Sequence, residues 1–271
     1  MIFSPSLPLV LALVGQGPPA PAAPDDPSAR LATMKASALG YEFRPAEGGA
    51  APFRMQADPA LRFTNPVGAL RDGAIFLWQD EVGRPAVASQ IYVDREGRWT
   101  HEFASLSAGP VLGTMAGAPA WMPSRAGVEF RPIPDAPRPA DSADRRLRQM
   151  QSLARDFVAE DQFRRESWQR LRMLSRPLAR YGGAGSDAAD GALFALVLAT
   201  DPEVYLLLES RAGRDGPEWH YALAPMTIFP VRASWKGKVV WERPFRWPAA
   251  TSPDAPFFVR KDVEVVGGPR P

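Results

Sequence analysis

The chain contains only two histidines, His101 and His220, so any reaction that needs an imidazole must use one of them. His101 lies between Trp99 and Phe103 in a strand-like stretch, where period-2 alternation puts these three side chains on one face and Glu102 on the other. His101 is either a hydrogen-bonded core residue or an acid or base facing a pocket. No complete catalytic set is present, and His101 and Glu102 are the catalytic candidates.

Two aspartates stand in nearly identical runs, Asp72-Gly73-Ala74-Ile75-Phe76 and Asp190-Gly191-Ala192-Leu193-Phe194. Paired carboxylates can act as general acid and base, and each Asp could face its counterpart across a pseudo-twofold axis. Asp-Gly is also ordinary turn chemistry, in which Gly takes a positive φ. We favour the turn.

Four arginines are candidates for binding an anion, because guanidinium groups hold carboxylates and phosphates through paired hydrogen bonds. They flank Pro59 and Pro177, which favour an edge strand or a bulge. A carboxylate within the same sheet is the alternative partner, and the structural use is favoured. The four residues are Arg54, Arg62, Arg172 and Arg180.

Several kinds of site are not indicated. The chain has no cysteine, which excludes disulfides and thiolate chemistry, and its two histidines are not spaced as metal ligands. The hydrolase elbow, the phosphate loop and the dinucleotide fingerprint are missing, so no cofactor and no metal are expected. Four tryptophans at matched places could stack on sugar rings, but they more simply mark a core: Trp99, Trp121, Trp219 and Trp241.

The elements that position these residues follow a repeat. A shift of 118 positions aligns residues 54–76 with residues 172–194 at eight identities in 23 pairs. We therefore interpret the chain as an internal duplication with an α+β fold. Each of two tandem units is expected to pack one amphipathic helix on a curled antiparallel sheet, and pseudo-twofold symmetry is expected to relate the units.

Each unit should begin with its helix. Asp26 and Pro27 form a start signal, and Asp141 opens the second helix, whose apolar stripe runs from Leu147 to Val158. Short alternating runs follow, and short connections between them favour antiparallel pairing. Strands are expected near residues 52–57, 73–79, 86–94, 98–107, 110–116, 119–122, 168–174, 191–199, 203–210, 218–224, 229–235 and 238–242.

The expected domain organisation follows from these elements. Residues 1–24 form a signal peptide, with an apolar run followed by Ala20-Pro21-Ala22, although no Lys or Arg precedes the run. A disordered or buried segment is the alternative. The rest divides into a first α+β unit (25–130), a Pro-rich linker (131–140), a second unit (141–244) and a Pro-rich tail (245–271), whose one possible strand either pairs with a sheet edge or is loose.

Composition limits the location and the partners. A net charge of +2 over 271 residues gives no electrostatic case for nucleic acid, and no segment is long enough to span a membrane. The signal peptide predicts export to the periplasm, the cell envelope or the medium. A protein partner or a cell-envelope ligand is therefore the expected partner class.

A resemblance supports the location. The runs Asp190-Gly-Ala-Leu-Phe-Ala195, Thr200-Asp201-Pro202-Glu203-Val204 and His101-Glu102-Phe103-Ala104-Ser105-Leu106-Ser107 resemble an uncharacterised family of exported bacterial proteins, over nearly the whole mature chain. The resemblance implies export and no activity.

Two function classes remain. The first is a non-catalytic exported protein for binding or assembly, in which a groove, a concave surface or a sheet edge receives the partner. The alternative is an exported hydrolase or isomerase that uses His101 with Glu102 or another nearby carboxylate.

Overall fold

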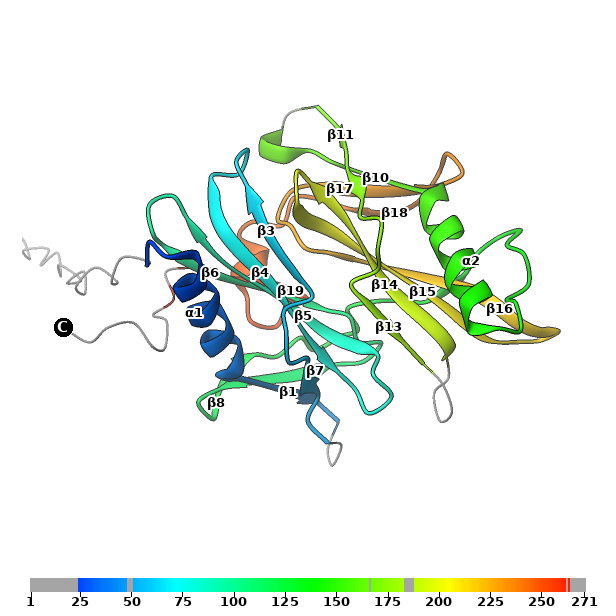
Figure 1. Ribbon diagram of the computed structural model, residues 1–271, viewed down its shortest axis with the longest axis horizontal. Helices are drawn as coiled ribbons and strands as arrows, with labels where there is room; N and C mark the ends of the chain where they lie inside the picture. The colour runs from blue at the N-terminus through cyan, green and yellow to red at the C-terminus, as the bar shows by residue number, and fades with distance from the viewer. Residues whose placement is uncertain (1–23, 48–50, 166, 183–187, 262, 264–271) are drawn as a thin grey trace, which may run out of the picture.

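A computed structural model describes residues 24–47, 51–165, 167–182, 188–261 and 263. The described strands pair antiparallel throughout and form four sheets, two large and two small (Figure 1). The predicted signal peptide lies outside the described residues, apart from Pro24. No helix among the described residues is long and apolar enough to cross a membrane.

The two large sheets form the centre of the molecule. The first has the strand order β19 (Phe257–Lys261), β6 (Trp99–Ser105), β5 (Pro85–Asp94), β4 (Leu70–Gln79), β2 (Arg54–Met55), and β3 (Leu61–Asn65) also pairs with β4. The second has the order β12 (Arg172–Met173), β14 (Ala188–Leu198), β15 (Asp201–Gly213), β16 (Gly216–Pro225), β9 (Arg131–Pro132), and β13 (Ala179–Tyr181) also pairs with β14.

The two small sheets and the helices cover the outer faces of the large ones. One small sheet has the order β1 (Tyr41–Pro45), β7 (Val111–Met115), β8 (Ala118–Trp121), and the other has the order β11 (Gln169–Arg170), β10 (Phe157–Asp161), β17 (Val231–Trp235), β18 (Lys238–Arg243). The helices are α1 (Pro27–Leu39) and α2 (Ala143–Asp156), with 3₁₀ turns η1 (Phe163–Arg165) and η2 (Ala249–Thr251).

Three apolar clusters hold the sheets together. One lies between the two large sheets and contains Ile75 and Leu77 of β4 with Leu193 and Ala195 of β14. The other two lie on the outer faces, beneath α1 with β1 and beneath α2 with β10. Ala74 to Trp78 are consequently buried without a break, because successive side chains enter cores on opposite faces of β4.

The predicted fold class is wrong. The structure is mostly β, with 49% strand and 14% helix, and its four sheets are arranged as a four-bladed β-propeller. It is not an α+β pair of tandem helix-on-sheet units, and the prediction of an internal duplication into such units is withdrawn with it.

Strand pairing explains this error. We expected each run of consecutive strands to form one curled sheet, but β7 pairs with β1 instead of β6, and β17 pairs with β10 instead of β16. The sequence analysis did not predict β1 and β10, which directly follow the two helices. The second helix was expected to continue to Val158, but α2 ends at Asp156 and Phe157 begins β10. The edge of β6 is taken by β19 and the edge of β16 by β9, so the Pro-rich tail and linker complete the two large sheets.

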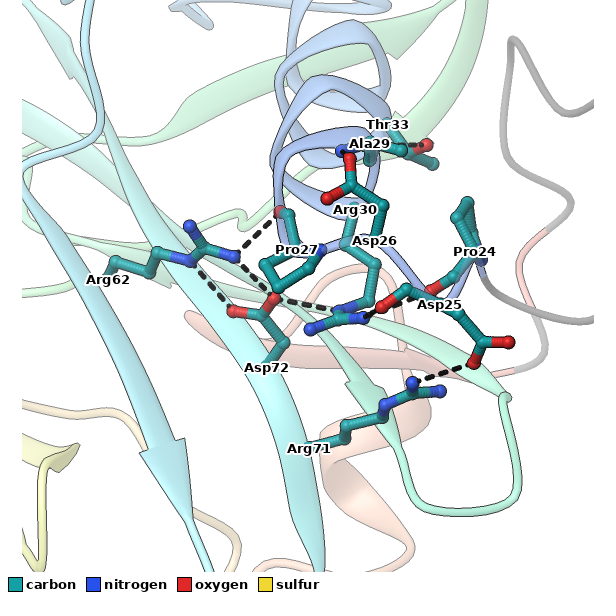
Figure 2. Close-up of polar contacts among 10 residues, drawn as sticks. All are labelled: Pro24, Asp25, Asp26, Pro27, Ala29, Arg30, Thr33, Arg62, Arg71 and Asp72. Carbon is teal, nitrogen blue, oxygen red and sulfur yellow. Dashed lines mark hydrogen bonds and ion pairs between the residues drawn. The ribbon is translucent and has the colours of Figure 1, made fainter.

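Asp72 anchors the start of α1 to the first large sheet (Figure 2). Its carboxylate accepts a hydrogen bond from Arg30 Nε at 2.8 Å and two from Arg62, from Nε at 2.9 Å and from Nη2 at 2.7 Å. Arg30 also donates to the carbonyl oxygens of Pro24 and Asp25, while Asp26 caps the helix as expected. Burial opposes ionisation of Asp72, but the two arginines outweigh it and lower the pKa of the carboxyl.

Asp190 has the same role for α2. Arg146 Nε lies 3.0 Å from its carboxylate, and Arg180 contacts both oxygens at 3.0 and 2.8 Å. Arg146 also donates to the carbonyl oxygens of Ala140 and Asp141, just ahead of the helix. Both aspartates therefore form ion pairs that join a helix to a large sheet.

The turn predicted for Asp-Gly is wrong. Gly73 and Gly191 lie inside β4 and β14, and neither has a positive φ. An aromatic ring covers each glycine: a Cβ at Gly73 would lie 2.3 Å from the ring of Phe63, and one at Gly191 would lie 2.5 Å from the ring of Tyr181. Glycine is required there for close approach of a ring to the backbone.

Candidate functional site: an acidic cavity between the large sheets

His101 is a core residue. Its side chain is fully buried in the outer core beneath β1, where Nδ1 forms a 2.8 Å hydrogen bond with the Tyr41 hydroxyl. Burial, with a smaller effect of the charge on Arg260, lowers the pKa of His101 to about 3. His101 therefore stays neutral at physiological pH, and it lines neither the cavity described next nor the two other cavities described below.

Glu102 points to the opposite face of β6, as alternation requires, and lines a cavity of about 290 Å³. The two catalytic candidates are thus separated by the sheet, and they do not form an acid–base pair. Strands of both large sheets contribute to this cavity, and its polar and charged side chains are Asn65, Gln90, Tyr92, Glu102, Arg164, Asp201, Glu203, Thr227 and Lys261.

Asp201 holds the two large sheets together at this cavity. It begins β15, immediately after the tight turn in which Ala199 has a φ of 55°. Its carboxylate accepts hydrogen bonds from Asn65 Nδ2 of β3 at 2.9 Å and from Gln90 Nε2 of β5 at 2.5 Å. Thr200 fixes the turn, because its hydroxyl donates to the carbonyl oxygen of Thr64.

Within the described chain, Glu102, Asp201 and Glu203 form no ion pair. Lys261 also lines the cavity, and its charge acts to lower the pKa of Glu102. Glu102 accepts a hydrogen bond from the Tyr92 hydroxyl at 3.0 Å, and Asp201 is held by neutral amides.

Glu209 of the same strand provides the contrast. It is also fully buried between the two large sheets, but Arg84 and Arg211 bind its carboxylate, at 2.9 and 2.7 Å, and Tyr181 donates to it at 3.0 Å. The fold therefore neutralises one buried inter-sheet carboxylate with two ion pairs, whereas the described carboxyl groups of the cavity form none.

The pKa values of the cavity carboxyl groups are raised. Burial, with the charge on Asp201, raises the pKa of Glu102 to about 8, and burial raises the pKa of Asp201 to about 7. Burial also raises the pKa of Glu203 well above its usual value, reinforced by the charges on Asp201 and Asp161. Near neutral pH, Glu102 and Asp201 therefore retain protons that water-exposed carboxylates would have released.

Two polar atoms in or near the cavity wall are unsatisfied. Gln90 is 2% exposed, and its amide oxygen has no hydrogen-bond partner although its nitrogen binds Asp201. The Tyr205 hydroxyl also lacks a hydrogen-bond partner. Burial raises the pKa of this phenol, and the nearby charges on Asp201 and Glu102 raise it further. A buried acceptor without a donor costs roughly 1–3 kcal/mol, so Gln90 offers a favourable contact to a donor that enters the cavity.

Aromatic rings line the remainder of the cavity. Phe163, Phe229 and Trp247 contribute to its wall, and cationic side chains of the protein already lie over two of these rings. The Lys261 ammonium is 4.8 Å from the centroid of Trp247, and the Arg164 guanidinium is 5.0 Å from the centroid of Phe163. The protein's own cations therefore already occupy one face of Trp247 and one face of Phe163.

The four arginine candidates lie elsewhere. Arg62 and Arg180 pair with Asp72 and Asp190, within their own sheets. Arg54 is exposed on β2, and Arg172 is exposed and donates to the carbonyl oxygen of Ala199 at 3.1 Å. The structure does not bring the four together into one anion clamp.

The matched tryptophans are mostly core residues. Trp99, Trp121 and Trp219 are at most 2% exposed, and the half-buried Trp241 lines a different, smaller cavity. None of them lines the acidic cavity, so they cannot stack on a ligand held there.

No group of three or more acidic or histidine side chains in the described part of the chain is placed to hold a metal ion. Comparison of the chain with protein-family models, curated proteins and solved structures finds no match.

Sequence reasoning found one of the cavity residues, Glu102, and assigned it to the wrong partner. It missed Gln90, Asp201 and Glu203. A signal was present, because the acidic residues Asp201 and Glu203 stand at the start of β15, directly before the apolar run Val204 to Leu208. Buried acidic residues at such positions are expected to have a specific partner.

Proposed function

We propose that the protein is a non-catalytic, exported binding protein, and that its ligand is a small organic cation with ammonium hydrogen-bond donors, held in the cavity between the two large sheets. The signal-peptide pattern of residues 1–24 supports export.

The observation that carries this proposal is the unsatisfied amide oxygen of Gln90, buried in a wall that also holds Glu102, Asp201 and Glu203. An ammonium group donates up to three hydrogen bonds and accepts none, so it matches a wall with a surplus of acceptors. A neutral alcohol would satisfy Gln90 but not the carboxylates, and an anion would be repelled.

The contrast with Glu209 supports a cation in particular. Two arginines neutralise that buried carboxylate from within the chain. The described carboxyl groups of the cavity form no such ion pair, and Lys261 and Arg164 also line the cavity, so a bound external cation would add the direct contact that these carboxyl groups lack. Burial strengthens this attraction relative to water, because the effective dielectric constant in the site is lower.

The size of the cavity restricts the ligand. A volume of about 290 Å³ suits a metabolite-sized amine. The wall rings Phe163, Phe229 and Trp247 would contact its carbon chain.

The experiment is isothermal titration calorimetry with three four-carbon probes at pH 8: 1,4-diaminobutane, 1,4-butanediol and succinate. We expect the diamine to bind at least ~10-fold more tightly than the diol, and succinate not to bind. Asp201→Asn and Glu102→Gln should each raise the Kd of the diamine by ~10-fold or more. The matched control is Glu42→Gln, which removes an exposed carboxylate on β1 and should leave affinity unchanged.

Equal affinity for the diamine and the diol, or equal loss in all three variants, contradicts the proposal. Thermal unfolding of each variant distinguishes a lost contact from a lost fold.

A further inference from the structure

A second, larger cavity lies at the chain segment 125–130, which precedes β9, and has a volume of about 720 Å³. Its charge is opposite to that of the acidic cavity. Four arginines line it: Arg211 near the end of β15, Arg243 at the end of β18, Arg246 just beyond, and Arg125. The two cavities share no lining residue.

Three of these arginines form no ion pair among the described residues, although the charge on Glu129 acts to raise the pKa of Arg243. They are Arg125, Arg243 and Arg246. Arg243 donates to the carbonyl oxygen of Glu242 at 2.9 Å, and the Nε of Arg246 is buried without a hydrogen-bond partner. The one carboxylate in the lining, Glu129, is paired with Arg131 at 2.8 Å.

Arg211 is fixed in place and the other arginines repel one another. Glu209 binds Arg211 Nε at 2.7 Å, and the guanidinium lies 4.0 Å from the ring centroid of Phe130. Burial, followed by the charges on neighbouring arginines, lowers the pKa of both Arg243 and Arg246. A set of guanidinium groups held together against their own repulsion, with a donor left unsatisfied, is the arrangement of an anion site.

The remaining wall is apolar. Val128, Phe130 and Phe257 line it beside the arginines. A ligand that fills the cavity therefore has an anionic group at the arginines and a carbon body against these side chains.

We propose that this cavity binds an organic phosphate, with the phosphate oxygens at Arg243, Arg246 and Arg125. The inference is independent of the proposed function, because it concerns a different cavity and a ligand of opposite charge.

The test is calorimetric titration of the full chain with glycerol 3-phosphate, alongside flotation with phosphatidylcholine vesicles that contain phosphatidylglycerol. The first probe represents a free organic phosphate and the second a lipid headgroup. We expect saturable binding of at least one probe, and a Kd that rises at least ~10-fold in Arg246→Gln and Arg243→Gln. The probe that binds identifies the source of the phosphate.

Arg44→Gln is the matched control, because it removes an exposed arginine on β1 that is paired with Glu42. It should leave binding unchanged. Arg246→Gln should also raise the melting temperature without ligand, because it removes one of the repelling charges. Absence of binding by both probes, an equal loss in Arg44→Gln, or a lower melting temperature in Arg246→Gln overturns the proposal.

Discussion

Gln90 of β5 donates its amide N–H to the Asp201 carboxylate at the start of β15, at 2.5 Å, and so joins two sheets through residues 111 positions apart. The pair stands at the acidic cavity and leaves the amide oxygen of Gln90 without a donor. The contact thus serves the fold and also defines the wall that a ligand would meet.

The acidic cavity should make the protein less stable as pH rises. Unfolded Glu and Asp titrate near pH 4, whereas Glu102 and Asp201 titrate at about 8 and about 7 in the folded chain. Between these values the unfolded state binds fewer protons than the folded state, so the free energy of unfolding falls with rising pH. We expect a fall on the order of 6 kcal/mol between pH 5 and 8, about 3 kcal/mol from each group, measured by urea unfolding.

The double variant Glu102→Gln/Asp201→Asn removes both titrating groups, and its stability should be flatter over the same range. A slope equal to that of the unmodified chain would show that these carboxyl groups titrate normally.

Asp72→Asn should destabilise the fold strongly, because it leaves the buried guanidinium of Arg30 without its counter-ion. Loss of one member of a buried ion pair costs roughly 3–5 kcal/mol. Asp190→Asn should cost a similar amount, since Arg146 and Arg180 contact Asp190 in the same way. The exposed pair of Lys35 and Asp58 supplies the control, and Asp58→Asn should change the unfolding free energy by less than ~1 kcal/mol. Equal effects of Asp72→Asn and Asp58→Asn would contradict the anchoring role.

Gly73→Ala should destabilise the first large sheet, because the added methyl group would lie 2.3 Å from the Phe63 ring. Overpacking of this kind typically costs ~1–3 kcal/mol. Gly109→Ala is the matched control, since its Cβ would meet nothing within 4 Å. Thermal unfolding compares the two, and a Gly73→Ala chain as stable as Gly109→Ala would mean that Phe63 can move aside.

The sequence predicted local features better than their assembly. Period-2 alternation correctly put His101 and Glu102 on opposite faces of one strand, and the Asp26-Pro27 signal correctly marked the start of α1. Sheet pairing failed because the partner of β7 is β1, some 70 positions earlier, and local pattern carries no information on such a choice. The unbroken apolar run from Ala74 to Trp78 is the signal that was not used, since it indicates a strand covered on both faces.

The acidic cavity could not be predicted for the same reason. Its wall combines Gln90, Glu102 and Asp201 from two sheets, and only the packing of those sheets makes them neighbours. Period-2 alternation placed Glu102 on the face of β6 opposite to His101, but it did not show that the second large sheet packs against that face.

Proton release on binding tests the central claim most directly. Calorimetric titration of 1,4-diaminobutane at pH 7, in two buffers that differ in ionisation enthalpy, gives the number of protons exchanged per ligand bound. A bound ammonium group favours the charged carboxylates, so we predict release of about one proton per ligand, with less release in Asp201→Asn. Binding without proton release, or no binding of the diamine at all, would contradict the account of an acidic cavity that holds a cation.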